Sequence, residues 1–126
     1  MTVQDADTAE GLGSGDVPVL ATPRLVALCE EASCRAVAAS LPEGRTSVGS
    51  RVQFDHLVPV PVGATVCAEA TLEKVEGRRL VFTVAATLRS TSRTGLVAAG
   101  RLTRVVVDRA EFMAKVVGPG PASPPR

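Results

Sequence analysis

The sequence predicts an α+β domain in which one long central helix is wrapped by a curved antiparallel sheet. Apolar residues recur at helical spacing between residues 22 and 40, and after residue 44 they alternate with polar residues in four successive segments. Short turn sequences between these segments indicate antiparallel strands. At 126 residues the chain has the length of one domain. We expect this domain over residues 1–116, with 1–18 partly loop, and a disordered, Pro- and Gly-rich tail over 117–126.

The helix is predicted from Thr22 to about Ser40. Thr22 is a favourable N-cap, Pro23 suits the first helical position, and the breaker sequence Leu-Pro-Glu-Gly follows at 41–44. The residues expected on its buried face are Leu25, Cys29, Ala32, Ala36 and Ala39. Because small side chains surround most of the helix, we expect other structure to cover most of its circumference.

The first predicted strand, over residues 51–58, places the only histidine on an apolar face. Val52, Phe54, His56 and Val58 alternate with Arg51, Gln53 and Asp55. Further strands are expected over 65–74, 79–89 and 96–107, followed by a helical turn over 108–112, and residues 1–21 are expected to be a loop with a short extended piece at 16–20. A helix followed by four antiparallel strands that curl around it is the hotdog fold.

Composition excludes several classes of partner. The formal charge of +1 argues against nucleic acid, which requires clustered positive charge, and the apolar runs are too short to cross a membrane. The N-terminus MTVQDADTAEGLG is acidic where a signal peptide is basic, so we expect a cytoplasmic protein. Cys29, Cys34 and Cys67 show neither disulfide nor zinc spacing and are interpreted as small buried hydrophobic residues.

Four positions are candidates for chemistry: Thr22 at the start of the helix, Glu30 within it, Gly49 before the first strand, and His56 on that strand. Six segments that include them resemble the fluoroacetyl-CoA thioesterase family of hotdog proteins. These segments are Val19-Leu-Ala-Thr22-Pro, Leu28-Cys-Glu30-Glu-Ala, Ser47-Val-Gly49-Ser, His56-Leu-Val-Pro-Val-Pro61, Val75-Glu-Gly-Arg-Arg-Leu80 and Phe112-Met-Ala-Lys-Val116. The spacing of Thr22, Glu30 and His56 is similar to that of the family's catalytic triad.

The resemblance implies hydrolysis of a short acyl-CoA by a homodimer, without metal or cofactor, with Thr22, Glu30 and His56 as catalytic residues. A thioester needs an attacking oxygen, a proton shuttle and donors for the oxyanion. His56 suits the shuttle, Glu30 could act as base, nucleophile or orienting group, and the Gly49 N–H could bind the oxyanion. Fluoroacetyl-selective members carry Phe residues before the helix, whereas residues 1–21 here contain no aromatic residue, so the acyl group is left open.

Helix geometry adds a constraint on the site. Eight helical residues rise by roughly 12 Å, so Thr22 and Glu30 of one helix cannot hydrogen-bond each other directly. Either the substrate lies between the two residues or the site is shared between subunits, and we favour a site at a two-fold interface with groups from both subunits.

Other interpretations stay open at this point. Each of the four residues also has a structural role: an N-cap, an exposed helix residue, a core histidine and a bulge. A hotdog dimer that binds an acyl thioester or another apolar ligand without catalysis is the main alternative, and a hydratase is the weakest because Asp55 faces away from His56. The arginines 78, 79, 101 and 104 are either contacts for CoA phosphates or solvated charges.

Overall fold

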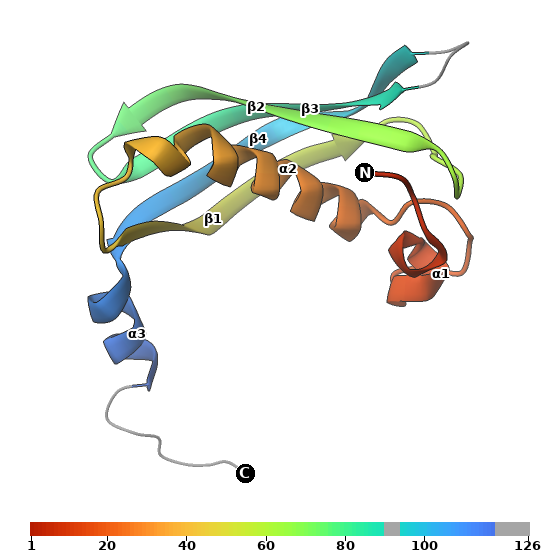
Figure 1. The fold of residues 1–126 in the computed structure, drawn as a ribbon. Helices are drawn as coiled ribbons and strands as arrows, with labels where there is room; N and C mark the ends of the chain where they lie inside the picture. Colours follow the sequence, from red (N-terminus) through yellow and green to blue (C-terminus); the bar gives the residue numbers. More distant parts are fainter. Residues whose placement is uncertain (90–93, 118–126) are drawn as a thin grey trace.

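The computed structural model describes residues 1–89 and 94–117. Along the chain these form the 3₁₀ helix η1 (Asp5–Asp7), the helices α1 (Ala9–Leu12) and α2 (Thr22–Val37), the 3₁₀ helix η2 (Ala38–Ser40), the strands β1 (Arg45–His56), β2 (Thr65–Glu76), β3 (Arg79–Arg89) and β4 (Thr94–Asp108), and helix α3 (Arg109–Val117). The long helix α2 lies along one face of the sheet, and α3 and the segment that contains α1 extend from opposite ends (Figure 1). This is the predicted α+β hotdog architecture.

The sheet contains four antiparallel strands in the order β1-β4-β3-β2. β2, β3 and β4 follow one another as hairpins, and Gly77 takes up φ +63° in the tight turn between β2 and β3, where a residue with a Cβ would be strained. β1 lies at the edge beside β4, so among the described strands one side of β1 has no neighbour. The strand ends differ from the expected ranges by a few residues, and β1 begins six residues earlier than predicted.

The core lies between α2 and the helix-facing side of the sheet. Leu25, Leu28 and Cys29 of α2 pack in one cluster with Phe82 and Leu102 of the strands, and all five are buried. Each fully buried Leu or Phe side chain contributes about 1.5–3 kcal/mol by leaving water, so this cluster fixes α2 on the sheet. The helix therefore provides a rigid base for residues at its N-terminus and on its uncovered side.

Two expectations for α2 were wrong. Ala36 is exposed, and so is Ala39, which lies in η2 after α2 has ended at Val37, because the buried face turns through Ala32, Ser33 and Val37 instead. The N-cap is Ala21, Thr22 is the first helical residue, and Pro23 follows it at the second position. No side-chain hydrogen bond caps the helix, because the side chain of Ala21 is a methyl group, and the Thr22 hydroxyl bonds His56 instead.

Coverage of the helix is also smaller than expected. Ala27, Glu31 and Cys34 are exposed along one side of α2. Within one protomer the sheet therefore covers only part of its circumference.

The N-terminal segment is more structured than the predicted loop. The Thr8 side chain caps α1 by accepting a hydrogen bond from the Gly11 N–H at 3.0 Å. The expected extended piece forms isolated bridges, Val19 with Pro61 and Leu20 with Thr8, rather than a strand. Because Leu20 N also donates to Val60 O at 2.8 Å, the segment is held against the chain that follows β1.

The C-terminal expectations are met in part. The helical turn predicted at 108–112 is the longer helix α3, which runs to Val117 and thus includes the first residue of the expected tail. Residues 118–126 of that tail lie outside the described residues, as does the polar segment 90–93. Within the described ranges, no helix has the length and apolar character that crossing a membrane requires.

Candidate active site

The hydroxyl of Thr22 and the imidazole of His56 form a direct hydrogen bond. Thr22 Oγ1 lies 2.8 Å from His56 Nδ1, although 34 residues separate them in the chain. Thr22 is the first residue of α2 and His56 the last of β1, where it pairs with Ala98 of β4. The amide of Leu57 then donates to Val97 O at 2.7 Å and fixes the end of the strand. The apolar face predicted for His56 is confirmed, and its side chain is half-buried.

The second ring nitrogen of His56 is left unpaired. Nε2 is buried and has no hydrogen-bond partner within residues 1–89 and 94–117. A neutral imidazole has one N–H donor and one acceptor nitrogen, so a threonine hydroxyl that donates to Nδ1 leaves the proton on Nε2. A buried donor without a partner costs about 1–3 kcal/mol. A hydrogen-bond partner for this nitrogen would therefore add stability.

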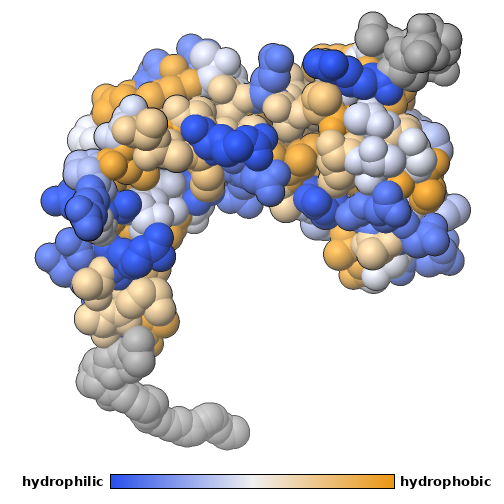
Figure 2. All heavy atoms as spheres, in the orientation of Figure 1, coloured by the Kyte–Doolittle hydropathy of each residue, from blue (hydrophilic) through white to orange (hydrophobic). Residues whose placement is uncertain are grey.

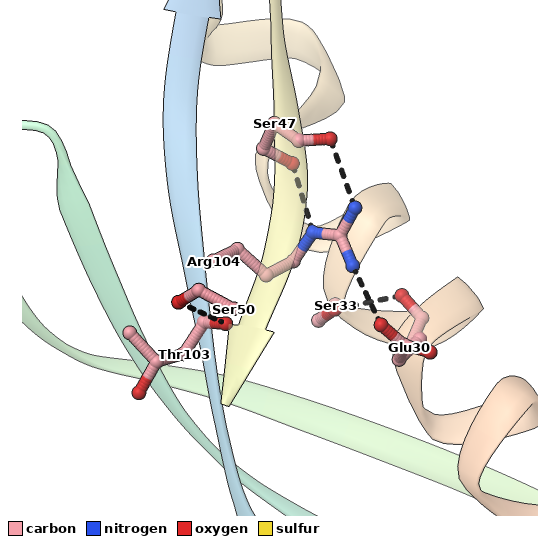
Figure 3. A network of polar contacts seen from close by, with 6 residues as sticks. All are labelled: Glu30, Ser33, Ser47, Ser50, Thr103 and Arg104. Atoms are coloured by element: carbon pink, nitrogen blue, oxygen red, sulfur yellow. Dashed lines mark hydrogen bonds and ion pairs between the residues drawn. The ribbon is translucent and has the colours of Figure 1, made fainter. Parts of the chain in front are cut away.

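A second polar cluster surrounds Glu30 in the middle of α2 (Figure 3). Arg104 of β4 donates from Nη1 to Glu30 Oε2 at 3.1 Å, from Nε to Ser47 Oγ at 2.9 Å and from Nη2 to Ser47 O at 2.9 Å. The Arg104 side chain is only 9% exposed, whereas Glu30 is 37% exposed. Each nitrogen of the guanidinium therefore donates within the protein, and the buried Arg104 is not placed as the CoA-phosphate contact that the sequence left open.

Gly49 allows the Glu30 carboxylate to approach the sheet. A Cβ at this position would lie 2.5 Å from Glu30 Oε2, so any other residue would displace the carboxylate. Gly49 pairs with Arg104, and the register of β1 against β4 shifts between Gly49 and Arg51, which leaves Ser50 as the extra residue of a bulge. The interpretation of Gly49 as a bulge is confirmed, and the close approach to Glu30 is an additional reason for glycine.

The four predicted residues form two pairs rather than one cluster. Thr22 lies with His56, and Glu30 lies with Gly49, while no hydrogen bond in the described part of the chain joins one pair to the other. This agrees with the rise of roughly 12 Å that separates Thr22 and Glu30 on one helix. One chain thus carries the four candidate residues as two separate pairs.

Arg104 and Ser47 lie beside Glu30, a position that the sequence analysis assigned to neither of them. The alternation in β4 places Leu102, Arg104 and Val106 on the face toward the helix. The sequence alone therefore indicates that Arg104 is a charged residue on an otherwise apolar face. Its partner was not visible, because Glu30 is 74 residues away and meets Arg104 only when β4 lies beside β1.

A cavity of about 350 Å³ adjoins Thr22 and His56. Its walls come from the N-terminal segment, the start of α2 and the chain after β1: Ala9, Ser14, Val17, Val19, Leu20, Ala21, Thr22, Pro23, His56, Leu57, Val58 and Pro59. Its volume falls in the range of small-molecule sites, roughly 300–1,000 Å³. On a larger scale the molecule is hollowed between α3 and the α1 segment (Figure 2).

Cys29 is not a candidate for the attacking group. Burial raises the pKa of the Cys29 thiol from 9.0 to about 11, which leaves it protonated and weakly nucleophilic at neutral pH. The expectation of a small buried residue holds for Cys29, whereas Cys34 is exposed and Cys67 half-buried. Among the described residues, no three His, Cys, Asp or Glu side chains are placed to hold a metal ion.

The chain is similar in sequence to proteins of known function. The family model described as fluoroacetyl-CoA-specific thioesterase matches residues 3–110. The fluoroacetyl-CoA thioesterase of Streptantibioticus cattleyicolor is 37% identical over 106 residues, which are 82% of this chain and 72% of that protein.

Solved structures show the same fold. A mutant of the fluoroacetyl-CoA-specific thioesterase FlK, in complex with fluoroacetate and CoA, superposes with a TM-score of 0.79 at 30% identity over 89% of this chain and 91% of that chain. A hot-dog-like protein from Thermanaerovibrio acidaminovorans gives a TM-score of 0.81 at 27% identity over 92% of this chain and 83% of that chain. The chain therefore belongs to the fluoroacetyl-CoA-specific thioesterase family and has its hotdog fold.

Proposed function

We propose that this protein is an acyl-CoA thioesterase that works as a homodimer, with Thr22, Glu30 and His56 as catalytic residues and Gly49 as a substrate-binding residue. The observation that carries the proposal is the 2.8 Å hydrogen bond between Thr22 Oγ1 and His56 Nδ1 at the wall of a cavity. Membership of a thioesterase family supports it, as does the FlK mutant structure in complex with fluoroacetate and CoA.

The hydrogen bond suggests how the thioester is attacked. Thr22 Oγ1 adds to the carbonyl carbon while His56 Nδ1 takes the hydroxyl proton as general base. The tetrahedral intermediate collapses, the C–S bond breaks, and the CoA thiolate leaves as a thiol with the proton from the imidazolium. Water then hydrolyses the Thr22 ester with His56 again as base, which releases the carboxylic acid.

The second pair of residues supports these steps from another copy of the chain. The unpaired Nε2–H of His56 needs an acceptor, and a carboxylate at this position would orient the ring and stabilise the imidazolium, as in other catalytic triads. Glu30 of the second copy supplies it, held in place by Arg104. The Gly49 N–H of the same copy binds the oxyanion, for which one donor contributes about 3–4 kcal/mol to the transition state.

The free edge of β1 offers a specific way to bring the two pairs together. An unpaired strand edge is a template for a second chain, and residues directly opposite each other share one face of the sheet. If two β1 strands pair antiparallel with Gln53 opposite Gln53, Arg51 faces Asp55 and Val52 faces Phe54 of the other copy. Opposite charges meet on the outer face, and apolar side chains meet on the helix side.

This register also aligns the site. Ser50 is the extra residue of the bulge and is skipped in the pairing. The residue that follows the Arg51–Asp55 pair is therefore Gly49 of one copy, which lies opposite His56 of the other, with both on the helix side of the sheet. Registers centred on Arg51 or on Asp55 would place like charges opposite each other, which destabilises a strand pair. Registers centred on Val52 or Phe54 would not pair Arg51 with Asp55, so the pairing through Gln53 is the homodimer that we propose.

Release of CoA thiol from acyl-CoA substrates tests the proposed activity. The native chain is expected to turn over at least one acyl-CoA, and His56→Ala is expected to lose about 10²–10⁴-fold in kcat while retaining its fold by circular dichroism. Binding of acyl-CoA without turnover by the native chain would instead favour a non-catalytic hotdog protein. Equal rates in the native chain and the variant would exclude His56 as the proton shuttle.

The proposed location is the cytoplasm. All three cysteines carry free thiols in the structure, which agrees with a reducing compartment. Fractionation of cells that express a tagged chain tests this directly.

A further inference from the structure

The cavity beside Thr22 and His56 has walls that determine which acyl group fits. In the proposed reaction the thioester carbonyl lies at these two side chains, so the rest of the acyl group extends into the space that they border. The inference below rests on the proposed function and specifies its substrate class.

The wall formed by the N-terminal segment is held in place by backbone hydrogen bonds. Ala9 N donates to Val19 O at 2.8 Å, and Glu10 N donates to Val17 O at 3.1 Å. α1 thus anchors the two valines at the cavity. The opposite wall is the chain that follows His56, where Leu57 and Val58 donate to Val97 O at 2.7 and 3.3 Å.

The lining is aliphatic apart from three small polar groups. Nine of the twelve lining residues are apolar, and the polar side chains are Ser14, Thr22 and His56. Within residues 1–89 and 94–117, no Asp, Glu, Lys, Arg or Phe lines this cavity. A charged acyl group would lose its hydration there without gaining a group of opposite charge. A hydrocarbon chain makes no hydrogen bonds to water and has no such cost.

The cavity is also larger than a two-carbon acyl group requires. A water molecule occupies about 30 Å³ of the liquid and a methylene group is of similar size, so 350 Å³ has room for roughly ten heavy atoms. In the protomer Val17 is 49% exposed, Leu57 54% and Val58 38%, which leaves apolar surface for a ligand to cover.

We propose that the acyl group is an uncharged aliphatic chain of about four to eight carbons, bound between the Val17–Val19 wall and the Leu57–Val58 wall. A fluoroacetyl group, with two carbons and one fluorine, would touch only the part of the cavity next to Thr22 and His56. Each methylene group buried in the cavity contributes about 0.8 kcal/mol, which is about a fourfold increase in kcat/KM.

The test is a homologous series of straight-chain acyl-CoAs from acetyl to decanoyl, with fluoroacetyl-CoA and succinyl-CoA included, followed by thiol release. We expect kcat/KM to rise about fourfold per methylene group from acetyl-CoA and to level off near the length that fills the cavity. Succinyl-CoA is expected to be slower than butyryl-CoA by more than tenfold. A maximum at acetyl- or fluoroacetyl-CoA, or a flat profile, would overturn the proposal.

A matched pair of variants ties the length preference to the cavity wall. Val17→Phe narrows the cavity and is expected to move the optimum toward shorter chains, with the largest loss of kcat/KM for the longest acyl-CoAs that the native chain accepts. Val62→Phe is the control, because Val62 is similarly exposed at 44% but does not line the cavity. An unchanged length profile in Val17→Phe would place the acyl group elsewhere.

Binding of alkyl-CoA thioethers separates this proposal from the proposed activity, since a thioether cannot be hydrolysed. Affinity by calorimetry is expected to rise with alkyl length in the native chain and to lose that dependence in Val17→Phe. If affinity rises with length but no thioester is turned over, the cavity assignment stands and the thioesterase proposal fails. If thioesters are turned over without any length dependence, the activity stands and the cavity assignment fails.

Discussion

The Thr22 hydroxyl, at the first residue of α2, lies 2.8 Å from Nδ1 of His56, at the last residue of β1. This bond joins the beginning of the helix to the end of an edge strand across 34 residues of sequence. The sequence predicts Thr22 as a helix N-cap, but in the structure its hydroxyl instead bonds the only imidazole in the chain.

Removing this hydroxyl should stop the attack on the thioester. Thr22→Val keeps the β-branched shape at the start of α2 and is expected to lower kcat by about 10²–10⁴-fold, whereas Thr22→Ser keeps the oxygen and most of the rate. Intact mass after rapid quenching should show an acyl adduct on the native chain and none on Thr22→Val. A Thr22→Val enzyme with native kcat would contradict the assigned role.

Arg104 should act as a positioning residue for Glu30. Lysine cannot reproduce the three hydrogen bonds that the guanidinium makes to Glu30 and Ser47, so Arg104→Lys is expected to reduce kcat about tenfold or more with a small change in KM. Because one partner of a largely buried pair is lost, Arg104→Met should also reduce the free energy of unfolding by about 1–3 kcal/mol.

A double-mutant cycle separates positioning from general stability. If Arg104 acts through the carboxylate, Arg104→Met should have little further effect on kcat in a Glu30→Gln background. Additive losses of log kcat would show that Arg104 acts independently of Glu30.

Gly49→Ala should damage activity more than stability. The added Cβ would meet Glu30 Oε2, which is the end of a flexible side chain and can move aside. The melting temperature is therefore expected to change by only a few degrees, while the displaced carboxylate lowers kcat. Gly95→Ala is the matched control, because a Cβ there would meet no atom within 4 Å. Equal activity in the two variants would argue against a role for the Gly49 position.

Oxidative cross-linking tests the proposed pairing of β1 strands. In a background with Cys34→Ala and Cys67→Ala, Gln53→Cys is expected to form a covalent dimer under mild oxidation, because residues opposite each other in an antiparallel pair have Cβ atoms about 4.5–5.5 Å apart. Thr103→Cys, on the same face of the sheet but on the inner strand β4, should stay monomeric on a non-reducing gel. Cross-linking of Thr103→Cys in preference to Gln53→Cys would place the interface elsewhere.

Much of the fold was predictable because its signals are local. The alternation that placed Val52, Phe54 and His56 on one face is a property of the strand itself, and Gly77 marks the turn between β2 and β3. Ala36 and Ala39 were misplaced because helical spacing alone does not show where α2 leaves the sheet and passes into η2.

The site was less predictable because its contacts are long-range. A threonine before a proline has the sequence of a helix cap, and only the folded chain shows that its hydroxyl bonds His56 instead. The same holds for Arg104, whose buried position could be inferred from β4 but whose bond to Glu30 depends on β4 lying beside β1. The two pairs, Thr22–His56 and Glu30–Gly49, are separate within one chain. That they meet in one active site, across the interface between two chains, is a proposal about the dimer.

Activity in mixed dimers tests this proposal most directly. Glu30→Ala and His56→Ala chains, each inactive alone, are unfolded together and refolded as an equal mixture, with mixed dimers confirmed by native mass spectrometry. If the site takes His56 from one chain and Glu30 from the other, each mixed dimer has one intact site and the mixture should recover about one quarter of the native activity. Mixed dimers that form and show no thioester hydrolysis would contradict a site shared between two subunits.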